Sequence, residues 1–173
     1  MRKFVVLLLA ITLCFSMVAC GGNSSKETEP KQGDLKKAVS LIKEAEEIAV
    51  SMGNTQLSNW TTGLLGVMRG MFTDAGYEIE RPKGWSNKVE RGMDECHQGR
   101  KDAKSKLESA RNIIAIGGSG DEYQAVKEYY SQVSALLTFV STYPEGYSEH
   151  TFTTTLAEYK KDCQTAYSKT QLY

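Results

Sequence analysis

The residues best suited to chemistry in this sequence are its two histidines and a neighbouring cysteine. Cys96 stands directly before His97, and the second histidine is His150. Imidazole and thiolate groups are common ligands of zinc and copper. In an antiparallel helical bundle, residues equidistant from a connecting loop lie side by side, which brings His97 and His150 to nearly the same end. The sequence therefore holds one candidate metal or cofactor site, formed by His97, His150 and Cys96.

The alternative interpretation is that both histidines cap helices or lie on the surface and bind no metal. The side-by-side alignment is good only to about one helical turn, and His97 lies beside the apolar stripe of its segment rather than on it. We therefore expect no metal and no cofactor, and retain the site at His97, His150 and Cys96 as the alternative.

Catalysis and nucleic-acid binding find no support in the sequence. There is no H-E-x-x-H or G-x-S-x-G motif. The run Gly117-Gly118-Ser119-Gly120 lacks the lysine of a phosphate-binding loop, so it is predicted to be a helix end and turn. The 21 basic and 21 acidic residues cancel, whereas nucleic-acid binders carry a basic excess. We expect neither an enzyme nor a nucleic-acid binder.

Cys96 and Cys163 are not expected to form a disulfide. Reflection of Cys163 through the two loops that separate the cysteines places it about 20 Å from the level of Cys96 along the bundle. The Cα atoms of a disulfide lie within roughly 7 Å of each other. Both cysteines also fall on apolar stripes, so they are predicted to be small buried hydrophobes.

Two surface patterns are candidates for binding patches. The basic group of Arg100, Lys101, Lys104 and Lys106 is interpreted as a solvated face that packs beside acidic helices. The tyrosines after residue 122 suit the boundary of a small bundle, where the ring is buried and the hydroxyl wet. If one face serves recognition, it is predicted to be the one that bears Tyr129, Tyr143 and Tyr147.

These side chains would be positioned by helices, because apolar residues recur at steps of three and four almost throughout residues 34–173. Three segments show the pattern clearly. Their stripes are Val89, Met93, Cys96, Arg100, Ala103, Leu107, Ala110 and Ile114, in which Arg100 is the exception; Tyr123, Val126, Tyr130, Val133, Leu137 and Val140; and Phe152, Leu156, Tyr159, Cys163, Ala166 and Thr170.

The predicted fold is all-α, an antiparallel up-and-down bundle of four long helices. The first helical segment either continues through Gly53-Asn54 or is split there, and the split gives the more compact bundle. Ser119 and Glu122 have the spacing of a capping box. Ser148 is predicted to cap the last helix, with Tyr147 and Phe152 as a hydrophobic staple.

The first residues have a different character. Arg2 and Lys3 precede an apolar run from Phe4 to Val18, which is too short to span a membrane stably and is typical of a secretory signal. Residues 21–33 (GGNSSKETEPKQG) contain no aliphatic or aromatic side chain, so they are predicted to form a flexible tether.

The run Met17-Val18-Ala19-Cys20-Gly21-Gly22 resembles the lipobox of bacterial lipoproteins. Met17 departs from that family, which usually has leucine at this position. The resemblance covers only the first 22 residues. It implies that the signal is cleaved before Cys20 and that Cys20 carries the covalent lipid, including a palmitate-type acyl chain. Multiple acyl chains would hold the protein stably on a membrane.

These observations divide the chain into a cleaved signal (1–19), a lipidated cysteine with its tether (20–33) and one helical domain (34–173). We expect a bacterial cell-envelope protein anchored on the extracytoplasmic side, in the cell membrane or the outer membrane according to its source. Its expected role is non-enzymatic binding of another envelope component, most naturally a protein.

Overall fold

The computed structural model describes residues 32–61, 87–142, 144 and 146–173. They form four helices: α2 (Gln32–Thr61), α3 (Asn87–Ile114), α4 (Asp121–Val140) and α5 (Glu149–Thr170). No strand occurs among these residues, so the prediction of an all-α bundle is confirmed. Helix α2 begins at Gln32, two residues inside the segment predicted as tether. The predicted signal, Cys20 and most of the tether lie outside the described residues.

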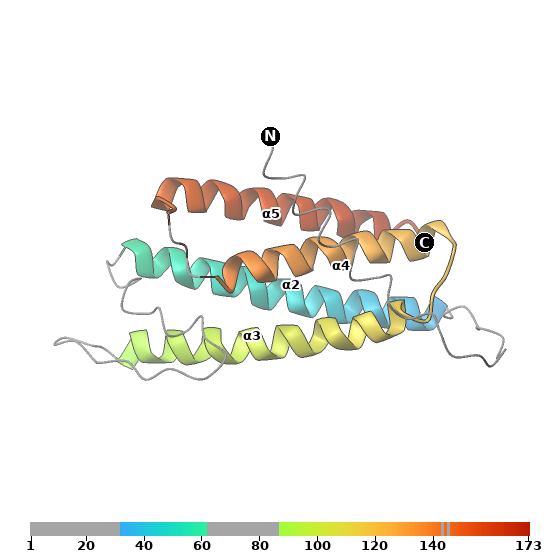
Figure 1. Ribbon diagram of the computed structural model, residues 1–173, viewed down its shortest axis with the longest axis horizontal. Coiled ribbons are helices and arrows are strands. Elements are labelled where there is room, and N and C mark those ends of the chain that lie inside the picture. The colour runs from blue at the N-terminus through green and yellow to red at the C-terminus, as the bar shows by residue number, and fades with distance from the viewer. Residues whose placement is uncertain (1–31, 62–86, 143, 145) are drawn as a thin grey trace.

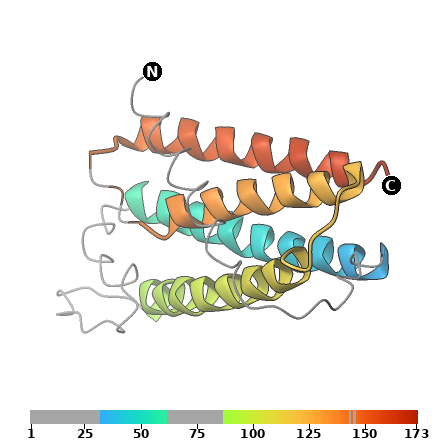
Figure 2. The ribbon, with the colours of Figure 1, turned by 45° about the vertical axis from the view of Figure 1, so that its right-hand side comes forward.

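Successive helices run in opposite directions along the bundle (Figures 1 and 2). Contacts between side chains give the same directions. Glu44 of α2 bonds to Lys106 of α3 and Met52 lies beside Gly99, so α3 is antiparallel to α2. Lys43 lies over the Tyr167 ring of α5 and Asn54 bonds to Lys160, so α5 is antiparallel to α2 as well. Helices α2 and α4 run parallel, because Glu46 and Gln56 of α2 contact Tyr129 and Val140 of α4 in the same order. The contacts therefore fit the predicted up-and-down order.

Helix α2 is the central element of the bundle. It packs against α3, α4 and α5, whereas α3 and α5 make no contact with each other within their described residues. Its buried face carries many small residues, which allows three neighbouring helices to approach one helix closely. The buried apolar residues of α2 are Leu35, Ala38, Ile42, Ala45, Ala49 and Met52.

The expected break at Gly53-Asn54 does not occur, because α2 is continuous through both residues. Gly53 is buried, and a Cβ atom there would lie 2.8 Å from Leu156 Cδ1 of α5 and 3.2 Å from Val140 Cγ1 of α4. The glycine therefore serves close packing rather than helix termination.

Of the two predicted caps, one is confirmed and one is wrong. Ser148 caps α5 with a reciprocal pair of hydrogen bonds to Thr151, and the rings of Tyr147 and Phe152 meet edge to face at 6.3 Å as a staple. Helix α4 instead starts at Gly120, which offers no side-chain hydrogen bond. The N-cap thus falls one residue after Ser119, so Ser119 does not hold the N-cap position that the predicted box requires.

Candidate functional site

The most distinctive chemical feature of the described residues is a buried carboxylate, Glu46, which is only 6% exposed. It belongs to α2 and faces α4 and α5. Tyr129 of α4 donates a hydrogen bond to Glu46 Oε2, and Lys43 Nζ lies 3.0 Å from the same oxygen. A buried carboxylate is strongly destabilising unless it is paired and hydrogen-bonded. The tyrosine and the lysine meet both requirements.

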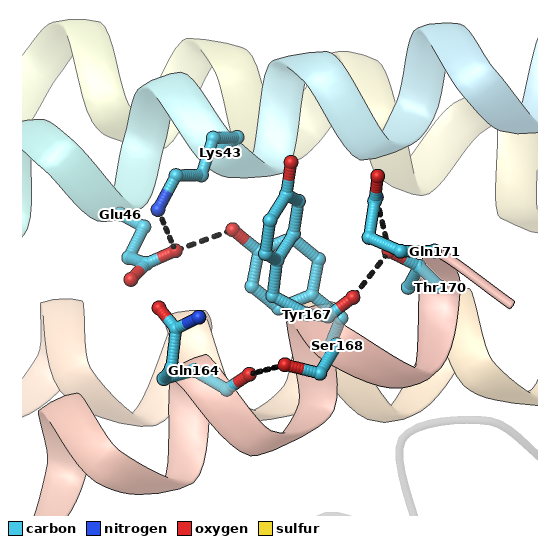
Figure 3. Close-up of polar contacts among 8 residues, drawn as sticks. Lys43, Glu46, Gln164, Tyr167, Ser168, Thr170 and Gln171 are labelled. Carbon is cyan, nitrogen blue, oxygen red and sulfur yellow. Dashed lines mark hydrogen bonds and ion pairs between the residues drawn. The ribbon is translucent and has the colours of Figure 1, made fainter.

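Aromatic rings enclose this pair. Lys43 Nζ lies 5.0 Å from the centre of the Tyr167 ring of α5, and the Tyr167 and Tyr129 rings are 5.3 Å apart. Figure 3 shows Lys43 and Glu46 on α2 facing Tyr167. The Lys43 side chain remains 31% exposed, so this residue lies between the buried cluster and the surface of the bundle. We call Lys43, Glu46, Tyr129, Cys163 and Tyr167 the polar core cluster.

Two groups of this cluster, Tyr129 and Cys163, hold their protons more tightly than usual. Burial, followed by the hydrogen bond to Glu46 and its charge, raises the pKa of Tyr129 far above its usual range. Burial and the Glu46 charge raise the pKa of the Cys163 thiol to about 12, although Lys43 acts in the opposite direction. A thiol reacts as its thiolate. At neutral pH, therefore, neither Cys163 nor Tyr129 supplies an anion for nucleophilic attack.

A second buried polar group lies near the end where α4 joins α5. Gln56 of α2 is 0% exposed, and its Nε2 donates to the backbone carbonyl of Val140. That carbonyl belongs to the last turn of α4, whose carbonyls lack partners within their own helix. Gln56 therefore caps α4 from a neighbouring helix. Its Oε1 has no hydrogen-bond partner among the described residues.

Aromatic side chains gather at this same end. The Phe139 ring of α4 lies 4.9 Å from Phe152, 5.1 Å from Tyr159 and 5.8 Å from Tyr147. Trp60 of α2 lies 5.4 Å from Phe152. Ring pairs at these distances add to the stability given by their burial. The cluster holds the ends of α2, α4 and α5 together.

The predicted tyrosine face is wrong in part. Tyr129 is 0% exposed and belongs to the interior, because its hydroxyl is bonded to a buried carboxylate rather than to water. Tyr143 lies outside the described residues. Tyr147 is 41% exposed and offers surface.

The basic residues on α3 do not all lie on a solvated face. Lys101 and Lys104 are exposed, whereas Arg100 is only 3% exposed and continues the buried stripe that it was expected to interrupt. Lys106 pairs with Glu44 of α2. The hydrogen bond and charge of Lys106 lower the pKa of Glu44.

The candidate metal ligands are not brought into one cluster. Cys96 and His97 lie on α3 and His150 on α5, the two helices that do not touch within the described segments. His150 is exposed, whereas Cys96 is 2% exposed. Burial raises the pKa of Cys96 to about 11, with a hydrogen bond from Thr55 acting in the opposite direction. Across residues 32–61, 87–142 and 146–173, no three His, Cys, Asp or Glu side chains are grouped to hold a metal ion.

Cys96 and Cys163 are both free and buried. Cys96 interacts with Thr55 and Cys163 with Glu46, and these two residues are separated along α2 by about 14 Å. The thiols thus occupy different levels of the bundle on helices that do not touch. Their lack of a disulfide in the native protein stays a prediction.

The polar residues of the interior were not predicted from the sequence, although a signal was present. Glu46 follows Ile42 by four positions and precedes Ala49 by three, so it lies on the apolar stripe of α2. Gln56 follows Met52 by four positions on the same stripe. A charged or amide residue on an apolar stripe needs a hydrogen-bond partner from another helix. Its position on the stripe is therefore the signal by which it could have been recognised.

None of the four described helices is both long and apolar enough to cross a bilayer. Comparison with protein-family models, with curated proteins and with solved structures found no match to this chain.

Proposed function

We propose that this protein is a lipid-anchored lipoprotein of the bacterial cell envelope, whose helical bundle acts by binding another envelope protein. The observation that carries the proposal is the run Met17-Val18-Ala19-Cys20 at the end of a short apolar segment. In this proposal Cys20 bears the lipid, and the bundle stands on the extracytoplasmic side of the membrane.

A binding role is supported by the chemistry of the bundle interior. Polar groups of the polar core cluster bond to one another: Glu46 accepts a hydrogen bond from Tyr129 and forms an ion pair with Lys43. The thiols of Cys96 and Cys163 are buried and have raised pKa values of about 11 and about 12. These residues stabilise the bundle, which leaves the surface for recognition.

The anchor is tested by metabolic labelling with radioactive palmitate in a bacterial host. The native chain is expected to incorporate the label and to sediment with membranes. Cys20→Ser should lose both properties, because the thiol that receives the lipid is gone. Cys14→Ser is the matched control, because Cys14 lies within the apolar run and should leave labelling unchanged. Labelling of Cys20→Ser at the native level would refute the anchor.

The binding role is tested with a photoreactive residue in native membranes. Glu149 is exposed and lies two residues from the exposed Tyr147, at the end opposite the start of α2. A photoreactive group at position 149 is expected to give one discrete crosslinked protein. The same group at Asp102, exposed on α3, serves as the control. Identical diffuse products from both positions would contradict specific binding.

A further inference from the structure

The end of the bundle where α2 begins carries three of the four large apolar side chains that are exposed among the described residues. Four large apolar side chains are exposed among the described residues: Ile116 (46%), Tyr147 (41%), Leu172 (77%) and Tyr173 (49%). The exposure of Tyr147 has a structural explanation, because its ring is the staple of α5 and packs on Phe152 and Phe139. The other three remain to be explained.

These three residues lie at one end of the molecule. Ile116 is in the turn from α3 to α4, and Leu172 and Tyr173 follow the end of α5. Because α3 and α5 both run antiparallel to α2, both end toward the end of the bundle where α2 begins. Figures 1 and 2 agree, since the start of α2, the end of α3 and the carboxyl end of the chain gather at the right-hand side of both.

The position of the proposed anchor brings this end toward a membrane. Gln32, where α2 starts, follows Cys20 by 12 residues. Even fully extended, 12 residues reach only about 40 Å. The opposite end of α2 is about 45 Å further along the helix axis. A lipid on Cys20 therefore keeps the end with Ile116, Leu172 and Tyr173 within reach of the bilayer and excludes a fully inverted bundle.

We propose that Ile116, Leu172 and Tyr173 form a membrane-contact end, which rests in the interface of the bilayer and sets the bundle upright on it. This inference rests on the proposed lipid anchor. Tyrosine favours the headgroup level, and isoleucine and leucine favour the boundary with the acyl chains. One loosely held apolar contact suffices, because the covalent lipid keeps the bundle near the surface.

The charges at this end determine which lipids it accepts. Lys36, Lys37, Arg111, Lys127 and Lys169 stand against Asp34, Glu108, Asp121, Glu122 and Glu128, so the two signs balance. Attraction to anionic headgroups requires a basic excess. The contact is therefore apolar, and it should form equally on neutral and anionic bilayers and persist at high salt.

The test uses the full lipidated protein in phosphatidylcholine vesicles, with a nitroxide attached to an introduced cysteine. Gln171→Cys places the label beside Leu172 without removing any of the three apolar residues, and His150→Cys places it at the other end; both positions are exposed. Cys96 and Cys163 are buried and should resist labelling. The ratio of collisions with oxygen to collisions with a water-soluble nickel complex is expected to be several-fold higher at position 171 than at position 150.

A second variant combines Ile116→Asp and Leu172→Asp with Gln171→Cys. Both apolar side chains are largely exposed, so the fold should persist by circular dichroism while the collision ratio at position 171 falls to that at position 150. In the protein with native Ile116 and Leu172, bound to vesicles, the collision ratio at position 171 could equal that at position 150. This result would overturn the membrane contact and leave the anchor intact. A chain that carries no lipid and stays in solution would overturn both proposals. The nitroxide at position 171 could be protected from the nickel complex in native membranes but not in vesicles. This result would overturn the lipid contact and assign this end to a protein partner instead.

Discussion

Tyr129 of α4 donates a hydrogen bond to the buried carboxylate of Glu46 on α2, and this bond joins two parallel helices. Small and aliphatic side chains along such an interface can exchange places when one helix slides by a turn. A buried carboxylate cannot, because the slide would leave it without a partner in the core. The pair between Glu46 and Tyr129 therefore favours one register of α2 against α4.

Tyr129→Phe should lower the free energy of unfolding by about 1–3 kcal/mol. The substitution keeps the ring but removes the donor, so the buried Glu46 keeps Lys43 and loses the tyrosine hydroxyl. Urea denaturation followed by circular dichroism measures the loss. Tyr130→Phe is the matched control, because Tyr130 is the next residue of α4 and its side chain is only half-buried. The two variants should differ clearly, and equal stability of both would remove the proposed role of the hydrogen bond.

The buried thiols should make the protein less stable in alkali. In the folded protein the pKa values of Cys96 and Cys163 are raised from 9.0 to about 11 and about 12. The folded state thus keeps protons that the unfolded chain releases. Their contribution is complete below pH 9 and is lost as the pH rises toward 11 or 12, by about 1.4 kcal/mol per pH unit for each thiol.

Urea unfolding under reducing conditions at several pH values above 9 measures this slope. Tyrosines and lysines titrate in the same range, so the comparison is between the native chain and Cys163→Ala. The variant should lose less stability per pH unit, whatever its stability at pH 8. Cys96→Ala should behave in the same way. Parallel curves for all three proteins would show that the folded thiols titrate like those of an unfolded chain.

The helices could be predicted because their information is local. On α5, Phe152, Leu156, Cys163, Ala166 and Thr170 lie on the predicted stripe, and all of them are buried. The Ser148 cap was found for the same reason, since its partner Thr151 is three residues away. Helical spacing and capping are both read from neighbouring residues.

Apart from the N-cap of α4, which falls one residue after Ser119, the errors concern relations between helices. Gly53 suggested a break, but its role is to admit Leu156, which is more than a hundred positions later in the chain. Tyr129 was assigned to a boundary because tyrosine usually has a wet hydroxyl, whereas its partner Glu46 is supplied by another helix. Arg100 was assigned to solvent by its charge alone. Each outcome depends on what faces the residue, which one sequence does not contain. The lipid on Cys20 stays a prediction.

Gln56→Glu should destabilise the protein, and more so at neutral pH than in acid. The buried Gln56 amide donates to the carbonyl of Val140, and a protonated carboxylic acid can make the same bond. A carboxylate there would face a carbonyl oxygen without a donor, so the folded state raises the pKa of the introduced acid. Stability is therefore retained below the unfolded pKa of about 4.3 and lost as the pH rises above it.

Unfolding midpoints in urea at mildly acidic and neutral pH measure this difference. Gln164→Glu is the control, because Gln164 is an exposed residue of α5 and its replacement should shift stability little. If Gln56→Glu showed the same pH dependence as Gln164→Glu, the side chain at position 56 would have to reach water rather than the end of α4.

Gly53→Ala should destabilise the bundle, although alanine favours helices over glycine by about 1 kcal/mol. The added Cβ would lie 2.8 Å and 3.0 Å from the two terminal carbons of Leu156, which is itself 1% exposed. Crowding of a packed core costs about 1–3 kcal/mol, which exceeds the helix gain. Gly92→Ala on α3 is the matched control, because its nearest contact would be Thr55 Cγ2 at 3.6 Å. There the helix preference should dominate and raise stability.

The opposite signs of these two substitutions, measured by urea unfolding, distinguish packing from helix preference. Leu156→Val in the Gly53→Ala background shortens the side chain that would be crowded. It should recover part of the loss, although the same change in the native chain removes a buried methylene and destabilises it. Such non-additivity arises only if the two residues touch. Stabilisation by Gly53→Ala would instead mean that α5 does not approach α2 closely at this level.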